Sequence, residues 1–394
     1  MTRPTFHFLF CLLCCLSWMS FAGQPADEGP SVRSADTTAA APAVSRSDDD
    51  WFDLSSFMDQ PYGFLPMLEP VTEPAIGYGA WFGPAFISKP TGTPRPGWVT
   101  PNLTYVGGMW TETDSWGVLA CDLRQWMDKR LQTLVVVLYS SLKLDFHGIG
   151  ENALLKDDPI HYTLTPLLGM AKLKYRLGMS NFWVGTGYQY STTTVKMDIP
   201  QEKFPQVQDI RKDSDVGGVL AILTFDSRDN IFTPLSGTLG EISGTFFSKA
   251  LGGDAAFQSY SATVLQYYSP DPTVTFGIRG DGLAAFGDAP FYMYPYVTLR
   301  GAAAMRYQGE QVAQVEFETR WQFWNRFSLI GFVGYGMAWN NFEYLENQIN
   351  IWTYGTGLRY ELARRYGLHF GVDVAWSPDD FAIYLQFGSA WMRP

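Results

Sequence analysis

Charged residues that alternate with apolar ones are the first candidates for chemistry in this sequence. In residues 312–323 the even positions include Glu316, Glu318 and Arg320, whereas the odd positions are mostly apolar. Because successive side chains of a β-strand point to opposite faces, this spacing places the three charges on one face. A guanidinium beside a carboxylate forms a strong, often bidentate ion pair. The chemistry that these residue types predict is therefore charge pairing in a shielded space.

Residues suited to making or breaking covalent bonds are scarce. The sequence contains no Gly-x-Ser-x-Gly and no His-Glu-x-x-His motif, which removes common signatures of hydrolases and zinc proteases. His369 shares the phase of Asp373 and is interpreted as a solvated histidine rather than a catalytic base. We expect no enzymatic activity, no bound metal ion and no cofactor.

Residues 1–22 have the features of a secretory signal. Arg3 gives a basic start, residues 6–21 are apolar, and a small-x-small cleavage site ends at Ala22. An uncleaved membrane anchor is the alternative, but the apolar stretch is short for a span of about 20 residues. Only Cys121 of the four cysteines would remain after cleavage, which excludes an intramolecular disulfide.

Residues 23–59 are expected to form a disordered periplasmic tail. Residues 23–50 contain no aromatic residue and are rich in Ala, Ser, Thr, Pro and Asp, so they cannot bury apolar surface. The composition changes at Trp51, and no linker follows it. Residues 60–394 are therefore expected to fold as one domain.

The composition of the chain narrows its class. Aromatic residues make up 16% and charged residues 17%, and the mean hydropathy is −0.08. Beyond the leader there is no apolar run of about 18 residues, which a membrane-spanning helix requires. The net charge of −11 argues against a nucleic-acid partner. Near-neutral hydropathy with many aromatic residues is typical of a transmembrane β-barrel, in which an apolar outer face and a polar lumen alternate along each strand.

Period-two alternation is clearest in the C-terminal third of the chain. Besides 312–323, it recurs in 350–362, 366–376 and 381–391. A soluble β-sandwich with one wet face is the alternative, but it would not need a secretory signal and four successive amphipathic strands. We predict an all-β fold, a transmembrane antiparallel β-barrel of about 16 strands. Tryptophans stand near the ends of the predicted strands, where a membrane interface favours them: Trp321, Trp339, Trp352, Trp376 and Trp391.

Sixteen segments qualify as strands, an even number as in single-chain bacterial barrels. They are 62–71, 75–88, 98–110, 115–126, 131–145, 161–177, 181–196, 215–226, 237–248, 256–269, 272–286, 311–324, 327–339, 350–362, 366–377 and 381–392. The longest gaps, 197–214 and 287–310, are expected to face outside, and short turns such as 377–380 the periplasm.

Two motifs in the second half of the chain have a distinctive spacing. The first comprises Asp226, Arg228, Asp229, Asn230, Pro234 and Gly237. The second is Arg300-Gly301, followed by Arg306 and Tyr307. They resemble the D-x-R-D-N … P-x-x-G turn and the sixth-loop Arg-Gly-Tyr signature of the bacterial surface antigen family, the outer-membrane barrels of the BamA/TamA type. Ala302 stands where that family has tyrosine.

The resemblance extends over residues 60–394. The family's Glu-x-Arg pattern is matched by Glu318 and Arg320, its Gly-Leu-Arg by the segment ending at Arg359, and its lumenal acid by Asp373. Larger members carry periplasmic POTRA domains, whereas only about 38 residues separate the expected cleavage site from the first expected strand. The chain therefore resembles the short members of the family that lack POTRA domains.

The resemblance implies that the sixth loop folds back into the lumen, where acidic side chains hold Arg300. Because Gly334 stands where the family often has aspartate, we expect Glu318 or Asp373 to be the main partner of Arg300, with Gly301 completing the motif. The alternative is that the lumen charges only solvate the lumen and neutralise one another. The other charges expected there are Arg279, Asp281, Glu316, Arg320 and Arg359.

The first predicted strand contains Pro61, Pro66 and Pro70, which cannot donate to a β-ladder. Its closure against 381–392 is therefore expected to be weak, as the lateral gate proposed for the family would need. An ordinary imperfect closure would look the same.

The function that the resemblance implies is protein insertion or translocation at the bacterial outer membrane. A passive or substrate-selective pore is the alternative, and a lipid-modifying enzyme is a third class. The expected partners are outer-membrane lipid and lipopolysaccharide, a protein substrate, and the cell's barrel-assembly machinery, which would insert the chain; no nucleic acid is expected.

Overall fold

The computed structural model describes residues 51–55, 63–88, 102–128, 130–149, 159–198, 210–230, 232–340 and 348–392. The predicted secretory signal, most of the predicted tail and Pro61 lie outside these residues.

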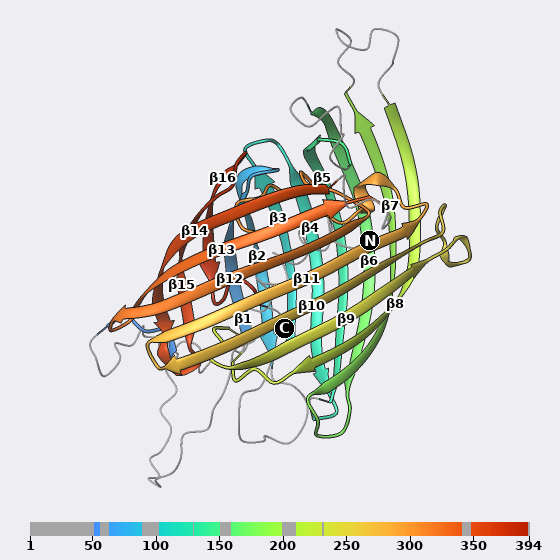
Figure 1. Ribbon diagram of the computed structural model, residues 1–394. Coiled ribbons are helices and arrows are strands. Elements are labelled where there is room, and N and C mark those ends of the chain that lie inside the picture. The colour runs from blue at the N-terminus through green and yellow to red at the C-terminus, as the bar shows by residue number, and fades with distance from the viewer. Residues whose placement is uncertain are drawn as a thin grey trace.

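Sixteen antiparallel strands, paired in chain order, form one sheet that curls into a nearly closed barrel (Figure 1). This confirms the predicted fold class. The strands are β1 (Gly63–Glu73), β2 (Gly77–Ser88), β3 (Asn102–Thr111), β4 (Trp116–Trp126), β5 (Leu131–Phe146), β6 (Ile160–Arg176), β7 (Phe182–Met197), β8 (Ile210–Asp226), β9 (Gly237–Phe247), β10 (Phe257–Asp271), β11 (Val274–Gly287), β12 (Gln311–Trp324), β13 (Phe327–Trp339), β14 (Gln348–Ala363), β15 (Leu368–Trp376) and β16 (Phe381–Phe387). Short 3₁₀ turns occur at Lys249–Leu251, Phe291–Met293 and Arg364–Tyr366.

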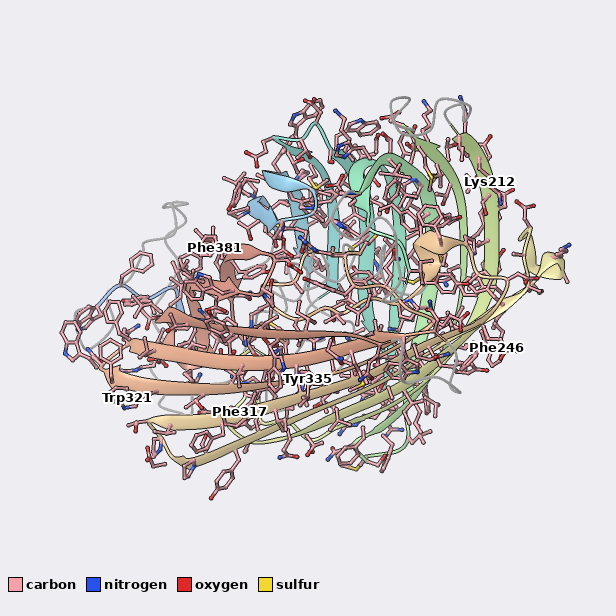
Figure 2. All side chains as sticks on the ribbon, turned by 45° about the horizontal axis from the view of Figure 1, so that its top comes forward. Lys212, Phe246, Phe317, Trp321, Tyr335 and Phe381 are labelled. Carbon is pink, nitrogen blue, oxygen red and sulfur yellow. The ribbon has the colours of Figure 1, made fainter. Side chains whose placement is uncertain are left out.

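The outer surface of the barrel is apolar. On β5, Val135 and Val137 are 47–48% exposed, whereas Leu134 and Val136, which alternate with them, are at most 8% exposed. Phe246, Phe317 and other aromatic side chains project from the outside of the barrel (Figure 2). An apolar belt around a nearly closed barrel is stable only against lipid.

No helix in the described part of the chain is both long enough and apolar enough to span a membrane.

The lumen wall is largely apolar on one side, which differs from the expectation of a polar lumen throughout. The inward residues of β2 to β6 include Trp81, Leu119, Val136 and Leu168, all at most 5% exposed. The apolar residues Tyr292, Met293, Tyr296 and Met305, from the connection between β11 and β12, belong to the same buried cluster. The wall is apolar in part because this connection lies inside the barrel and packs against it.

The two ends of the barrel are called here the loop end, which carries residues 288–310 and 377–380, and the turn end, which carries 325–326 and 364–367. The placement of 377–380 on the opposite side from 288–310 was wrong. In a meander, the connections that follow odd-numbered strands all lie at one end, so β11–β12 and β15–β16 connect at the same end. An ion pair of 2.8 Å between Arg306 Nη1 and Asp380 Oδ1 joins the two connections.

The last predicted strand, 381–392, is shorter in the structure, where β16 ends at Phe387. Gly388 has a φ of +73°, and a Cβ there would lie 2.7 Å from the Phe232 carbonyl oxygen. The chain therefore turns inward at Gly388. Trp391, expected at the membrane interface, is instead 2% exposed inside the barrel.

Residues 51–55, which lie within the expected disordered tail of 23–59, contact the turn end of the barrel. The Leu54 N–H donates to the Leu362 carbonyl at 2.9 Å, and Arg326 Nη1 donates to Asp53 Oδ2 at 2.8 Å. Arg326 is fully buried. This part of the segment is ordered because Asp53 compensates a buried cation that has no access to water.

The contact of Asp53 with Arg326 predicts acid sensitivity of this segment. Burial raises the pKa of the Asp53 carboxyl, but the hydrogen bonds from Ser55 and Arg326 together lower it by more than burial raises it. The pKa therefore lies below its usual value. A carboxyl of this kind stabilises the fold above its unfolded pKa of about 3.9 and loses that contribution as the pH falls through the folded pKa. We expect residues 51–55 to detach below about pH 4, observed as a change in Trp51 fluorescence. Asp53→Asn should abolish this acid transition, and an unchanged transition in that variant would contradict the assignment.

β1 and β16 lie side by side where the sheet would close. Each is paired along its length with its sequence neighbour, and within the described residues no ladder joins the two strands to each other. This boundary between β1 and β16 is called the seam.

Prolines explain why the seam edge of β1 pairs poorly. Pro66 lies opposite Pro84 in the β1–β2 register, and the β2–β3 register skips Pro84. The missing donor of Pro84 therefore faces β3. In an antiparallel pair whose residues do not bond each other, the two N–H positions point away from each other. Pro66, and Pro70 four residues on, consequently lack their donors on the edge that faces β16.

Candidate functional site

Arg300 lies inside the barrel and contacts three carboxylates. Its Nε donates to Glu316 Oε1 at 2.8 Å and its Nη1 to Asp373 Oδ2 at 2.9 Å. Its Nη2 lies 2.7 Å from Glu318 Oε2 in an ion pair that lacks hydrogen-bond geometry. Burial lowers the pKa of the guanidinium, but the three carboxylates raise it more, so the pKa lies above its usual value. Arg300 therefore remains charged although its side chain is only 7% exposed.

The strands that carry these acids explain the geometry. Glu316 and Glu318 are two residues apart on β12, so both point inward. Asp373 reaches the same place from β15 because Gly357 on β14 leaves room: a Cβ there would collide with Asp373 Oδ1. The Phe332 ring on β13 lies 3.6 Å from Arg300 Cζ and covers one face of the guanidinium.

The structure brings together every residue named for the Arg300 contact, and it adds Glu316. Asp373 also accepts two hydrogen bonds from Arg359, at 2.6 and 2.7 Å, so one carboxylate serves two guanidinium groups. Gly301 has a φ of +91°, and its N–H donates to the Tyr384 hydroxyl at 2.9 Å. A Cβ at Gly301 would lie 3.2 Å from the backbone of Trp376. Both the positive φ and this close approach therefore favour glycine at this position.

A second polar contact holds the same connection nearer its start. Arg279 Nη2 donates to Thr298 Oγ1 at 2.9 Å, and the Thr298 N–H donates to Gln314 Oε1 at 2.7 Å. Arg279 and Gln314 both contact Asp281. Residues 298–301 are therefore tied to β11, β12, β15 and β16 at once.

The end of the connection binds the 377–380 turn. The Tyr307 hydroxyl donates to Asp379 Oδ2 at 2.7 Å. Burial, followed by this carboxylate, raises the pKa of Tyr307 above its usual value, so the hydroxyl keeps its proton as a donor. Residues 288–310, held at these points, are called the lumenal connection.

The predicted turn motif lies at the turn end and reaches across to β14 and β15. Arg228 forms a bidentate contact with Asp226 at 3.0 and 2.8 Å. Asn230 Nδ2 donates to the Tyr366 carbonyl at 2.7 Å. At Gly237 the φ is +102° and a Cβ would lie 2.4 Å from the Ser227 carbonyl oxygen. The Leu235 N–H donates to Asp229, and Pro234, the residue before Leu235, lines a cavity inside the barrel.

Residues 232–236 and 388–392 meet at the turn end and are called the lumen floor. The Ser389 N–H donates to the Phe232 carbonyl at 2.5 Å, and the Phe232 side chain packs with Met392. The floor covers part of the barrel mouth opposite the lumenal connection.

Trp391 is a site residue that the sequence did not indicate. Its indole Nε1 donates to Glu316 Oε2 at 2.5 Å, so Glu316 bridges Trp391 and Arg300. Its ring packs on Gly277, where a Cβ would lie 2.7 Å from the Trp391 side chain. The one available signal was Gly388, because a glycine near the end of a predicted strand marks a turn or bulge.

Arg320 is a predicted lumen charge that does not join the Arg300 contact. Its Nη2 donates to Thr275 Oγ1 at 3.1 Å, and no carboxylate of the described residues is placed against it as an ion pair. His369 lies beside it, 5% exposed, and accepts or donates a bond with Thr233. The described residues contain no cluster of metal-ligating side chains.

Comparisons with known proteins match the fold. No family model matches the sequence, and no curated protein matches it. Among solved structures, BamA from Haemophilus ducreyi lacking POTRA domains 1–3 is similar, with a TM-score of 0.56 and 13% identity over 84% of this chain and 70% of that one. CdiB from Acinetobacter baumannii is similar with a TM-score of 0.53 and 10% identity over 82% of this chain and 59% of that one. At these identities the comparisons establish a shared fold: the sixteen-stranded barrel of this chain resembles the folds of BamA and CdiB.

Proposed function

We propose that this protein is an outer-membrane barrel of the surface antigen type that inserts or translocates protein substrates, with the lumenal connection latched in the lumen by Arg300. The observation that carries the proposal is the Arg300 contact with Glu316, Glu318 and Asp373. The fold shared with BamA and CdiB supports the same class of protein.

The latch argues against a passive pore. A pore needs an open path along the barrel axis, whereas here the lumenal connection lies at one end and the lumen floor at the other. Breaking one partner out of a buried ion pair costs about 3–5 kcal/mol, so the connection is held firmly in place.

The seam supplies a route that does not pass along the axis. An unpaired strand edge is a template on which another strand can form a ladder. β16 presents such an edge, because within the described residues it pairs only with β15. On the facing edge of β1, Pro66 and Pro70 lack donors, and the seven residues of β16 are fewer than the eleven of β1. A substrate strand could therefore pair with the barrel at the seam and pass sideways into lipid.

Reconstitution tests the proposal directly. We expect liposomes that contain the protein to fold a urea-denatured small outer-membrane barrel faster than protein-free liposomes. A cysteine pair placed across the seam, chosen from residues 68–72 of β1 and 381–385 of β16 in a Cys121→Ala background, should abolish the acceleration when oxidised and restore it when reduced.

The matched control is a cysteine pair at Leu68 and Phe82, which face each other in the β1–β2 register and do not need to part. Oxidation of that pair should leave the folding rate unchanged. If the unmodified protein gives no acceleration, or if both oxidised pairs act alike, the insertion proposal is wrong.

A further inference from the structure

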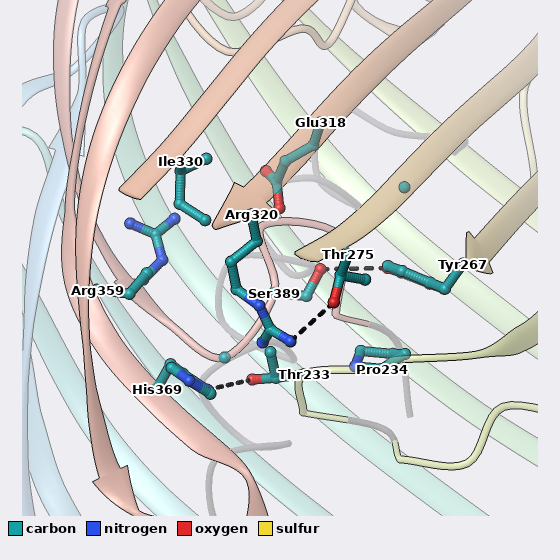
Figure 3. Close-up of a pocket in the computed structure, with 12 residues that line it drawn as sticks. Thr233, Pro234, Tyr267, Thr275, Glu318, Arg320, Ile330, Arg359, His369 and Ser389 are labelled. Carbon is teal, nitrogen blue, oxygen red and sulfur yellow. Dashed lines mark hydrogen bonds between the residues drawn. The ribbon is translucent and has the colours of Figure 1, made fainter. Parts of the chain in front are cut away.

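A cavity lies between the Arg300 ion pairs and the lumen floor (Figure 3). It has about 380 Å³ of empty space, part of it open to solvent. The polar part of its lining contains two arginines, one histidine, four hydroxyl side chains and a single carboxylate: Arg320, Arg359, His369, Thr233, Tyr267, Thr275, Ser389 and Glu318. Both halves of the floor contribute, because Thr233 belongs to one and Ser389 to the other.

Arg320 projects into this cavity without a full set of partners (Figure 3). Its side chain is 8% exposed, and Thr275 takes one hydrogen bond from Nη2. Its Nη1 is buried and has no hydrogen-bond partner among the residues that the structure describes. A buried guanidinium nitrogen without a partner is costly, because the group has lost its water and gained nothing in return.

The carboxylates nearest in charge interaction to Arg320 bind other groups. Glu318 Oε2 lies against Arg300 at 2.7 Å. The other two, Glu361 and Asp229, accept bonds from Arg364 and from the Leu235 N–H respectively.

Arg359, the second arginine of the lining, already donates hydrogen bonds to Asp373 from both of its terminal nitrogens. It adds positive potential to the cavity but leaves the direct donor role to Arg320. His369 Nδ1 lies 3.3 Å from Thr233 Oγ1 and 3.1 Å from the Gly367 carbonyl oxygen. The hydroxyl groups of Thr233, Thr275 and Ser389 can each turn a proton toward a new acceptor.

We propose that this cavity binds a small free oxyanion of the phosphate class, with Arg320 Nη1 as its anchoring donor and the lumen-floor hydroxyls as further donors. A free ion fits better than a lipid headgroup because the side chains of the lining are mostly buried inside the barrel and none is among its exposed apolar residues. The bound anion would join β12 to both halves of the floor and so hold the turn end closed. This site adjoins the Arg300 latch, because Glu318 belongs to both and Arg359 binds Asp373. The proposed anion binding does not depend on the proposed insertion activity.

Thermal unfolding of the purified full-length barrel in detergent tests the proposal. Inorganic phosphate is titrated against sodium chloride of equal ionic strength, and the apparent unfolding temperature is followed by intrinsic fluorescence. We expect phosphate at about ten times its Kd or above to raise the unfolding temperature by about 2–4 °C. Arg320→Gln should remove that response, and Arg320→Lys should keep part of it.

Two controls make the result decisive. Arg211→Gln removes the same charge from an exposed position on β8 and should respond to phosphate like the unmodified protein. Heat-modifiable gel migration checks that each variant is folded. If Arg320→Gln does not fold, the phosphate-binding isotherm of Arg320→Lys is compared with that of the unmodified protein. The proposal is overturned if phosphate has no effect on the unmodified protein, or if it has an equal effect on folded Arg320→Gln. It is also overturned if the phosphate isotherm of Arg320→Lys is unchanged, or if the protein responds only to anionic lipid in nanodiscs.

Discussion

Arg300→Ala should turn a barrel of small, erratic conductance into one of larger and steadier conductance in planar bilayers. The substitution leaves Glu316, Glu318 and Asp373 buried around an empty position, with Asp373 compensated by Arg359 alone. Loss of one partner from a buried ion-pair set costs about 3–5 kcal/mol. The lumenal connection should therefore leave the lumen for a substantial fraction of the time, and the barrel should also unfold at a lower temperature.

Two further variants separate release of the latch from a simple loss of charge. Arg300→Lys keeps the charge but cannot form three directed contacts at once, so its conductance should lie between those of the unmodified protein and Arg300→Ala. Arg306→Ala removes a partly exposed ion pair with Asp380 from the same connection and should have a small effect. A steady, large ohmic conductance in the unmodified protein would instead favour the passive pore.

Trp391→Ala should destabilise the barrel about as strongly as a large core deletion, by about 3–5 kcal/mol. Trp391 is 2% exposed and packs with Leu239, Leu265 and Tyr267. It also donates to Glu316, so its removal weakens the floor and loosens one carboxylate of the latch. Temperature-dependent migration on gels and fluorescence report the loss, and conductance should rise as it does for Arg300→Ala.

Trp391→Phe isolates the hydrogen bond from the packing. It keeps most of the ring but leaves Glu316 Oε2 without its indole donor, which should cost about 1.5–3 kcal/mol because the acceptor is charged. If Trp391→Phe and Trp391→Ala were both neutral, the indole would not be buried beside Glu316 in the membrane, and the inward turn at Gly388 would be wrong.

The two variants should be coupled because Arg300 and Trp391 share Glu316. Residues with a common partner are typically non-additive by about 0.5–3 kcal/mol. The lumenal connection at one end and the lumen floor at the other thus meet at a single carboxylate on β12. Release of one end is expected to loosen the other.

The sequence by itself determined the barrel and, for the C-terminal strands, the side of each strand that faces the lumen. Two-residue alternation is local: the phase of Glu316, Glu318 and Arg320 follows from backbone geometry alone, and the structure places all three inside. Strand number and most strand bounds were predictable for the same reason. The resemblance motif marked Arg300, and its acidic partners stood on the right phase of their own strands.

Only the tertiary structure decided which charges meet. Glu316 joins the Arg300 contact, whereas Arg320, four residues along the same face, has no ion pair with any residue that the structure describes. The path of the lumenal connection determines at which level along the barrel axis the Arg300 guanidinium lies. The inward course of Trp391 likewise depends on a single positive φ at Gly388 and on space above Gly277. Alternation specifies a face of a strand, but it carries no information about contacts between segments that lie far apart in the chain and close together inside a cylinder.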